Sequence, residues 1–294
     1  MANTIAGANL AEIAQESLQG LSTLFAPLAA LTTDFSNDVR NAGESVTTRY
    51  PTKPTAADMT GGVKSAAADV AMTSATITLD THYGFTYGFT DVERSKSSIN
   101  LNNLFIQPAL QALGDKVFGD VWNLITNANF GTSSVITAAN FDRDDLIDLG
   151  TTLTATKKAP QQGRAIFMNP TYYGSLVKTL NSAEFPGMGN DKAEAQVPRV
   201  AKFDSYETDI ADANSENLAA FAFQKNALLM AGRTVDTELA SQSGIEVETV
   251  VIPGLGLPVQ FRRFYDSEGI LYYNCQLLYG VAKGVDYGVR VTTA

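Results

Sequence analysis

The spacing of apolar residues predicts one long helix near the first third of the chain. Residues 101–127 read LNNLFIQPALQALGDKVFGDVWNLITN, where apolar side chains recur every three or four positions. Pro108 suits the first turn, and Gly114 and Gly119 are expected where another backbone comes close. The residues of the expected buried face are Ile106, Leu110, Leu113, Val117, Val121 and Leu124.

The N-terminal part of the chain, before this helix, contains a short predicted helix followed by a polar segment. A helix is expected at 8–20 and Pro27 limits its extension, while residues 36–62 contain few large apolar side chains. Such a segment cannot form a core of its own, so we expect an arm that lies on another surface. The apolar positions that suit the N-terminal part to lying on a neighbour are Leu10, Ile13 and Leu21, and Ile5 also falls near helical spacing with them.

Residues 63–95 change to a period of two, which predicts long β-strands. Aromatic side chains alternate from Tyr83 to Phe89, and Gly84 and Gly88 interrupt the opposite face, which suggests bulges or close backbone contact. A long hairpin with a weak tip near 61–69 fits this pattern.

Two further helices flank a short strand. Residues 140–158 start with Asn140 as the candidate N-cap, followed by Asp142, Asp144 and Asp145, and end with Lys157 and Lys158. Residues 164–168 (RAIFM) predict a strand, and Asn169–Pro170 opens a helix through Leu180. The remaining expected strands are 199–209, 218–224, 244–253, 257–266, 269–280 and 287–293. The class is therefore α+β.

Composition narrows the function. The 294 residues, 45% of them hydrophobic and 18% charged, can fold into about two domains. A net charge of -10 argues against a DNA reader, because phosphate binding needs clustered cations. The pairs Lys157–Lys158 and Arg262–Arg263 are interpreted as surface charge. No apolar run suits a membrane span and no signal peptide is evident, so use in a cytoplasm is expected.

The residues that could carry chemistry do not form a familiar site. The single histidine, His82, has no nucleophile motif beside it, and the single cysteine, Cys275, lies in an apolar run as a buried thiol. Asp91 and Glu93 stand beside Arg94, which predicts an ion-paired strand end. The acidic run 142–145 lacks the glycine and distal glutamate of a calcium loop, and 254–258 (GLGLP) is interpreted as a turn. We expect no catalytic, cofactor-binding or metal-binding residues.

The order of these parts resembles the major capsid proteins of tailed bacteriophages with the Hong Kong ninety-seven fold. The resemblance covers nearly the whole chain as a pattern of parts. The family's spine helix is similar to LNNLFIQPALQALGDKVFGDVWNLIT, and its axial domain is similar to FDRDDLIDLGTTLTATKKAPQQGRAIFMNPTYYGSLVKTL. The family's strand followed by an Ala-Leu segment is similar to AAFAFQKNALLMAGR, and its closing strands are similar to LYYNCQLLYGVAKGVDYGVRVTT.

The resemblance implies a division into five parts. These are an N-terminal arm (1–50), an extended hairpin loop (51–92), a peripheral domain with the spine helix (93–134), an axial domain (135–265) and closing strands (266–294). Some members cross-link subunits through a Lys–Asn bond. Lys64 is the one position here that could serve, and no partner residue can be placed.

It also implies a function: a non-enzymatic coat protein that self-assembles into an icosahedral shell around double-stranded phage DNA. The expected partners are copies of the chain in hexamers and pentamers, a separate scaffolding protein, a portal protein, DNA bound nonspecifically and a possible cement protein. The expected location is the virion capsid, assembled in the host bacterial cytoplasm, without a cofactor. Three alternatives stay open: an encapsulin-like nanocompartment, another virion part such as a tail tube, and an enzyme with an unfamiliar site.

Overall fold

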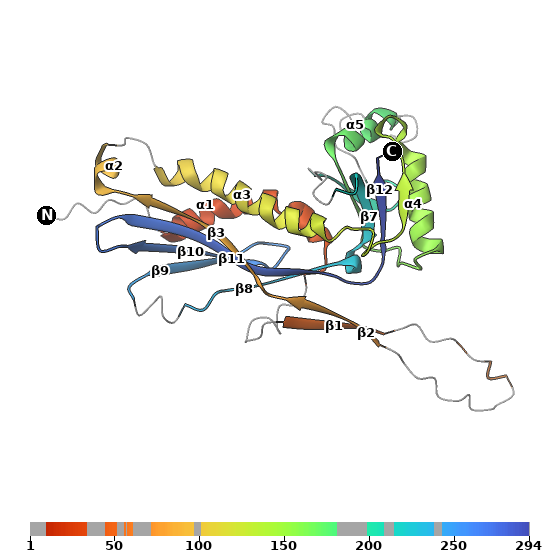
Figure 1. Cartoon of the computed structure of the whole chain (residues 1–294), viewed down its shortest axis with the longest axis horizontal. Helices are drawn as coiled ribbons and strands as arrows, with labels where there is room; N and C mark the ends of the chain where they lie inside the picture. Colours follow the sequence, from red (N-terminus) through yellow and green to blue (C-terminus); the bar gives the residue numbers. More distant parts are fainter. Residues whose placement is uncertain are drawn as a thin grey trace.

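The chain forms an elongated part and a compact part, with a two-stranded ribbon standing off the elongated part (Figure 1). The computed structural model describes residues 10–33, 45–51, 56, 58–60, 72–96, 101–180, 199–208, 215–237 and 243–293. Helices and sheets are mixed along the chain, so the predicted α+β class is confirmed.

The elongated part is an antiparallel sheet with two helices on one face (Figure 1). Its strands in spatial order are β3 (Thr81–Phe89), β11 (Leu271–Lys283), β10 (Pro258–Tyr265) and β9 (Glu246–Val251), and β8 (Leu228–Arg233) pairs with the far half of β11. The helices are α1 (Leu10–Leu24) and α3 (Leu101–Asn123). Alternation along β11 places Tyr273, Cys275 and Leu277 in the core beneath these helices.

Helix α3 has the buried face that the sequence predicts. Leu110, Leu113, Val117 and Val121 are buried, Leu124 follows the helix end, and the side chain of Ile106 lies outside the described part. The placement of Pro108 in the first turn is wrong, because the helix already begins at Leu101. Packing of the face therefore outweighs the one backbone donor that the proline lacks.

The two glycines of α3 differ. A Cβ at Gly114 would lie 2.5 Å from the side chain of Leu24, so a group does come close there, but it is a side chain of α1 and not the expected backbone. Nothing lies within 4 Å of a Cβ at Gly119, so the same expectation is wrong for that residue.

Helix α1 belongs to the core of its own chain. Leu10 and Leu21 are buried against α3, β9 and β10, and the helix ends at Leu24 before a short 3-10 helix, η1 (Ala26–Ala30), that contains Pro27. The expectation that Leu10 and Leu21 lie on a neighbour is therefore wrong, since the sheet of the same chain covers them. Ile5 and the side chain of Ile13 lie outside the described residues.

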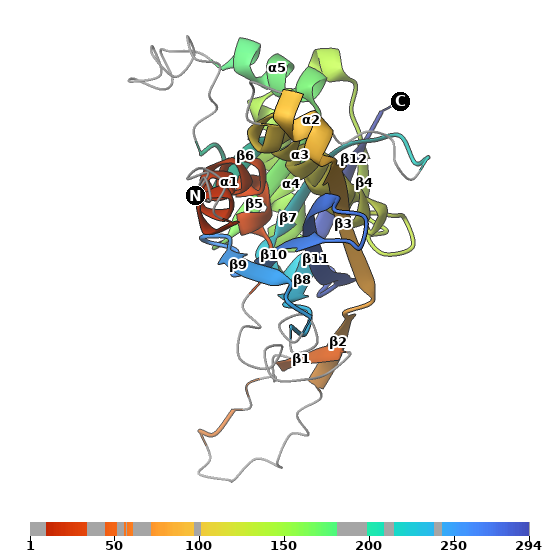
Figure 2. The ribbon, with the colours of Figure 1, turned by 90° about the vertical axis from the view of Figure 1, so that its left-hand side faces the viewer.

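The ribbon pairs β1 (Ser45–Pro51) with β2 (Met72–Thr78), in a register from Ser45 opposite Thr78 to Pro51 opposite Met72. The expected tip at 61–69 lies outside the described residues. The period-two stretch is not one strand: β2 stays in the ribbon while β3 joins the main sheet. Figure 2 shows the ribbon leaving the face of the sheet opposite α1 and α3.

The base of the ribbon is anchored on the main sheet. Val46, Ile77 and Leu79 pack on Leu229 of β8. The carbonyl oxygen of Thr78 would lie 2.0 Å from a Cβ at residue 280 of β11, so a glycine is required there for the strands to cross. Beyond this base the ribbon has few buried side chains.

The compact part is a second sheet with helices on its outer side (Figure 1). Its strands in spatial order are β4 (Ser133–Val135), β12 (Gly288–Thr292), β7 (Leu218–Gln224), β5 (Arg164–Met168) and β6 (Phe203–Glu207). Helices α4 (Arg143–Ala155) and α5 (Pro170–Thr179) cover one face of this sheet. The C-terminal end of α3 packs on the other face, where the ring centroids of Trp122 and Phe167 are 4.9 Å apart. Strands β5 and β7 are buried along their whole length because both faces are covered.

The start of α4 corrects one sequence assignment. The N-cap is Asp142, whose carboxylate accepts the N–H groups of Asp144 at 2.8 Å and Asp145 at 3.2 Å. Asp145 in turn accepts the N–H of Asp142, which completes a capping box. Asn140 instead ends a 3-10 helix, η2 (Ala138–Asn140), so its assignment as the cap is wrong.

The neighbouring elements agree with the sequence. Strand β5 has the predicted bounds, Asn169 caps α5 by accepting the N–H of Tyr172 at 3.0 Å, and the six predicted later strands are all present. Sequence reasoning missed β4 and β8, and it placed the residues of β1 in the polar arm segment. It also set the end of α4 too late, since the helix ends at Ala155, before Lys157 and Lys158.

Candidate functional site

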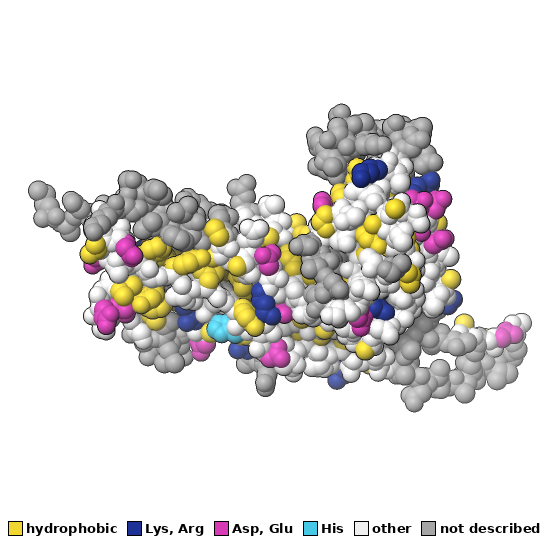
Figure 3. All heavy atoms as spheres, turned by 45° about the horizontal axis from the view of Figure 1, so that its top comes forward, with side chains coloured by type: hydrophobic (Ala, Val, Ile, Leu, Met, Phe, Trp, Pro, Cys, Tyr) yellow, Lys and Arg dark blue, Asp and Glu magenta, His cyan; other side chains and the backbone are white. Residues whose placement is uncertain are grey.

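The residues weighed for chemistry lie apart from one another. His82 is exposed near the start of β3, the single cyan side chain in Figure 3, with Nε2 3.3 Å from the side-chain amide of Gln276. Asp91 and Glu93 follow the other end of β3, about 30 Å away at ~3.3 Å per residue. The structure therefore does not bring the histidine and these carboxylates together.

Asp91 and Glu93 do not form the expected strand end. They lie in the first turn of a short helix, α2 (Asp91–Lys96). Glu93 accepts hydrogen bonds from the N–H of Thr90 at 3.0 Å and from its hydroxyl at 2.8 Å, and these bonds hold the pKa of the carboxyl below its ordinary value. A Thr-x-x-Glu capping box explains this carboxylate, and the side chain of Arg94 lies outside the described part.

The remaining single candidates have structural surroundings. Cys275 is 1% exposed, and burial raises the pKa of its thiol, as expected for an inert residue. Lys64 lies outside the described residues. The described parts of the chain contain no group of three or more histidine, cysteine or acidic residues that could hold a metal, and none of their helices is long and apolar enough to cross a membrane.

The cation pairs are only partly surface charge. Lys157 is 10% exposed and pairs with Asp286 at 2.5 Å, and Arg263 pairs with Glu246 at 2.7 Å. The first pair joins the segment after α4 to the segment before β12 and the second joins β10 to β9, so the simple surface interpretation is wrong for Lys157, while Arg263 pairs with a largely exposed carboxylate. Lys158 is exposed, in a left-handed backbone conformation with φ of 56°.

Arg290 of β12 joins the compact part to the end of α3. It is buried and donates to the carbonyl oxygen of Phe130 at 2.8 Å, to Glu216 at 2.6 Å and to the side chain of Asn127 at 2.7 Å. Glu216 also accepts the N–H of Asn127 at 2.7 Å. This network fixes the loop after α3 against the C-terminal strand.

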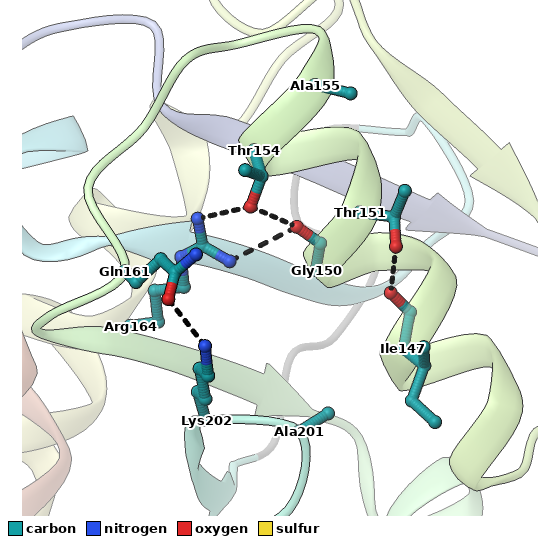
Figure 4. A pocket seen from close by; sticks show the side chains of 9 residues that line it. All are labelled: Ile147, Gly150, Thr151, Thr154, Ala155, Gln161, Arg164, Ala201 and Lys202. Atoms are coloured by element: carbon teal, nitrogen blue, oxygen red, sulfur yellow. Dashed lines mark hydrogen bonds between the residues drawn. The ribbon is translucent and has the colours of Figure 1, made fainter.

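A groove of about 380 Å³ lies along the second half of α4 (Figure 4). Ile147, Thr151 and Ala155 form one side, Ala201 and Lys202 lie opposite, and Arg164 lies between them. Both residues opposite α4 have left-handed φ angles, 49° and 71°. Lys202 Nζ donates to the side-chain oxygen of Gln161.

Arg164 is a structural cation. It is 2% exposed and its guanidinium donates to the carbonyl oxygens of Gly150, Ala159 and Pro160 and to the hydroxyl of Thr154, at 2.9 to 3.1 Å. These oxygens surround the C-terminal end of α4, where a cation is favoured. Burial lowers the pKa of Arg164, which has no reacting partner in this arrangement.

Sequence reasoning did not select Arg164 or Arg290. Each is one basic residue in an otherwise apolar strand, RAIFM or GVRVT. Because a buried charge must be paired or hydrogen-bonded, this pattern is a signal that could have indicated a buried polar network. Lys202 carries no such signal, since the surrounding sequence is polar.

Comparison with known proteins identifies the fold. No family profile and no curated protein sequence matches the chain. The capsid of cyanophage P-SCSP1u is similar in structure, with a TM-score of 0.61 and 14% identity over 86% of this chain and 84% of that one. The capsid of cyanophage Pam1 has a TM-score of 0.61 and 12% identity over 92% of each chain.

A virus-like particle from Pyrococcus furiosus is also similar, with a TM-score of 0.56 and 12% identity over 97% of this chain and 100% of that one. At these identities the likeness is one of fold. The chain has the fold of phage capsid proteins, as the sequence resemblance implied.

Proposed function

We propose that the chain is a shell subunit, a major capsid protein that self-assembles into an icosahedral shell around the double-stranded DNA of a tailed phage. The observation that carries the proposal is the likeness to phage capsids over 92% of both chains in the Pam1 comparison. Such coverage includes both parts of the molecule, so the whole chain is accounted for by one architecture.

The form of the subunit supports assembly. The ribbon of β1 and β2 stands off the body and is mostly exposed beyond its base, so its ordering is best explained by contact with other copies. We expect subunit contacts well above the roughly 1,600 Å² of an ordinary complex. The division into arm, extended loop, peripheral domain, axial domain and closing strands is proposed on the same basis.

Electron microscopy of the purified chain tests the proposal. The expected result is closed particles, or rings of five and six subunits that assemble into closed particles when the protein concentration is raised. A monodisperse monomer at all concentrations would contradict it. We further propose a portal protein, a separate scaffolding protein and a possible cement protein as partners, and assembly in the host bacterial cytoplasm; co-expression with candidate genes tests each.

The full-length likeness to the Pyrococcus furiosus particle favours a second candidate, an encapsulin-like compartment. The contents of the particle separate the two. Nuclease-protected double-stranded DNA in particles from infected cells supports the capsid, while a stoichiometric protein cargo and no nucleic acid supports the compartment. Hydrolysis or transfer of a substrate by the isolated chain would instead show that the chain is an enzyme.

A further inference from the structure

The exposed side of α4 carries opposite charges at its two ends. Asp144 and Asp148 are exposed near the start of the helix, and Lys158 is exposed just beyond its end. The start contains four carboxylates and one guanidinium in the run DRDDLID, so its net charge is -3. Ile147 is 41% exposed between them, which leaves an apolar side chain on the same stripe.

The groove adds cationic groups at the other end. Arg164 is bonded only to neutral oxygens, and Lys202 is bonded to the neutral side chain of Gln161. The nearby acids are already paired, Asp204 with Arg199 at 3.3 Å and Asp286 with Lys157 at 2.5 Å. Lys158 adds a further exposed cation, so this end has an excess of positive charge.

Asp144 at the acidic end is too far from the basic end to be neutralised within one copy, while Asp148 is closer, about 10 Å from Ala155 at ~1.5 Å per residue. Asp144 and Ala155 are about 16 Å apart at ~1.5 Å per residue, which is roughly twice the screening length in physiological salt. Copies that each carry a net charge of -10 repel one another in general. A contact between copies is therefore favoured where an acidic surface meets a local excess of cations.

We propose that the acidic start of α4 in one copy docks on the basic groove at the end of α4 in a second copy. The proposal rests on the shell function and names one contact within it. The two surfaces differ, so the contact is head-to-tail, and each copy keeps one unused surface for the next. Repetition of such a contact closes into a ring when the rotation allows it. Ile147, which lies between Asp144 and Asp148 and also lines the groove, supplies an apolar side chain beside the charges.

Charge reversal tests the contact. The variants Asp144→Lys/Asp148→Lys and Lys158→Glu/Lys202→Glu are each expected to lower the assembled fraction about tenfold at fixed protein concentration, measured by light scattering. The chain with all four changes restores opposite charges and is expected to assemble to within about threefold of the unchanged chain. Lys178→Glu on α5 and Glu207→Lys on β6 are matched controls on the same part and are expected to assemble normally.

Restoration by the fourfold variant also shows that the reversed helix folds. If each two-residue variant assembles normally while the unchanged chain also assembles, the contact is overturned and the shell function stands. If the fourfold variant folds, by melting temperature, but does not assemble, the contact is again overturned. If the unchanged chain itself forms no rings or particles, the proposed function fails instead.

Mixing the two reversed variants tests the head-to-tail arrangement. One variant then has two basic ends and the other two acidic ends, so they must alternate around a ring, and only rings with an even number of members close. An icosahedral shell needs five-membered vertices, so micrographs of the mixture should show six-membered rings, sheets or tubes. Closed icosahedral shells from the mixture would overturn the arrangement.

Discussion

At the scale of single residues, the stability of the chain depends on a few buried charges. Arg290 is the clearest, because its guanidinium bonds to Glu216, Asn127 and the backbone of Phe130. The side chain of Arg290 is 5% exposed and that of Glu216 29%. Removing the cation would take the counter-charge from the carboxylate, which keeps the N–H of Asn127, and would take a hydrogen-bond donor from two other acceptors.

We expect Arg290→Met to lower the free energy of unfolding by about 3 kcal/mol, near the lower end for breaking a buried pair, since Glu216 is partly exposed. Urea unfolding of dissociated subunits measures this. The matched change Arg263→Met breaks a pair whose carboxylate, on Glu246, is 54% exposed, and should cost at most about 1 kcal/mol. Equal losses for both variants would show that burial does not decide the cost.

The sequence predicted some residue roles and not others. The Asn169 cap follows from local chemistry, because Asn-Pro at a helix start needs no distant partner. The roles of Arg164 and Arg290 depend on groups from other elements, such as Gly150 and Glu216, which only the fold brings close. Candidate surface charges such as Lys202 could not be selected in advance, because an exposed cation has no sequence pattern.

At the scale of elements, the cap of α4 can be tested directly. Asp142→Ala removes the acceptor for two backbone N–H groups and should cost about 1 kcal/mol. Asn140→Ala, at the position that the sequence suggested, should change stability by less than about 0.5 kcal/mol. Thermal unfolding of dissociated subunits compares the two. A larger loss from Asn140→Ala would return the cap to that residue.

Two glycines give a second test at this scale. In Gly280→Ala the new Cβ would lie 2.0 Å from the carbonyl oxygen of Thr78, a backbone atom that no rotamer change can move. We expect a loss of about 1–3 kcal/mol and a displaced ribbon. Gly119→Ala places a Cβ in open space within a helix and should gain up to about 1 kcal/mol. Urea unfolding measures both changes. An unchanged free energy of unfolding in Gly280→Ala would contradict this prediction.

Element types were predicted better than their assignment to sheets. The period-two pattern from 72 to 89 correctly indicated β-structure, yet the break near Leu79 places β2 and β3 in different sheets. Periodicity describes which side of a strand is covered and not which strand pairs with it. The short strand β4 has three residues, too few to show alternation.

At the scale of the whole molecule, the packing of α1 shows what a single sequence leaves open. An amphipathic helix buries its apolar face equally well on a neighbour or on its own chain. Here the face of Leu10, Leu21 and the following Phe25 completes the core between α3 and the main sheet. An arm that contacts neighbouring copies would therefore have to be formed by the polar segment after this helix, and not by the helix itself.

The charge of the whole molecule gives the last prediction, which concerns DNA. With 31 acidic and 21 basic side chains, a shell built from this chain, as proposed, should repel phosphate groups, and a wall that packs DNA must let it move. We expect gel shifts with double-stranded DNA only at low salt, with equal affinity for unrelated sequences and a shallow dependence on salt, because few phosphates are neutralised. A tight complex with one sequence at physiological salt would contradict this.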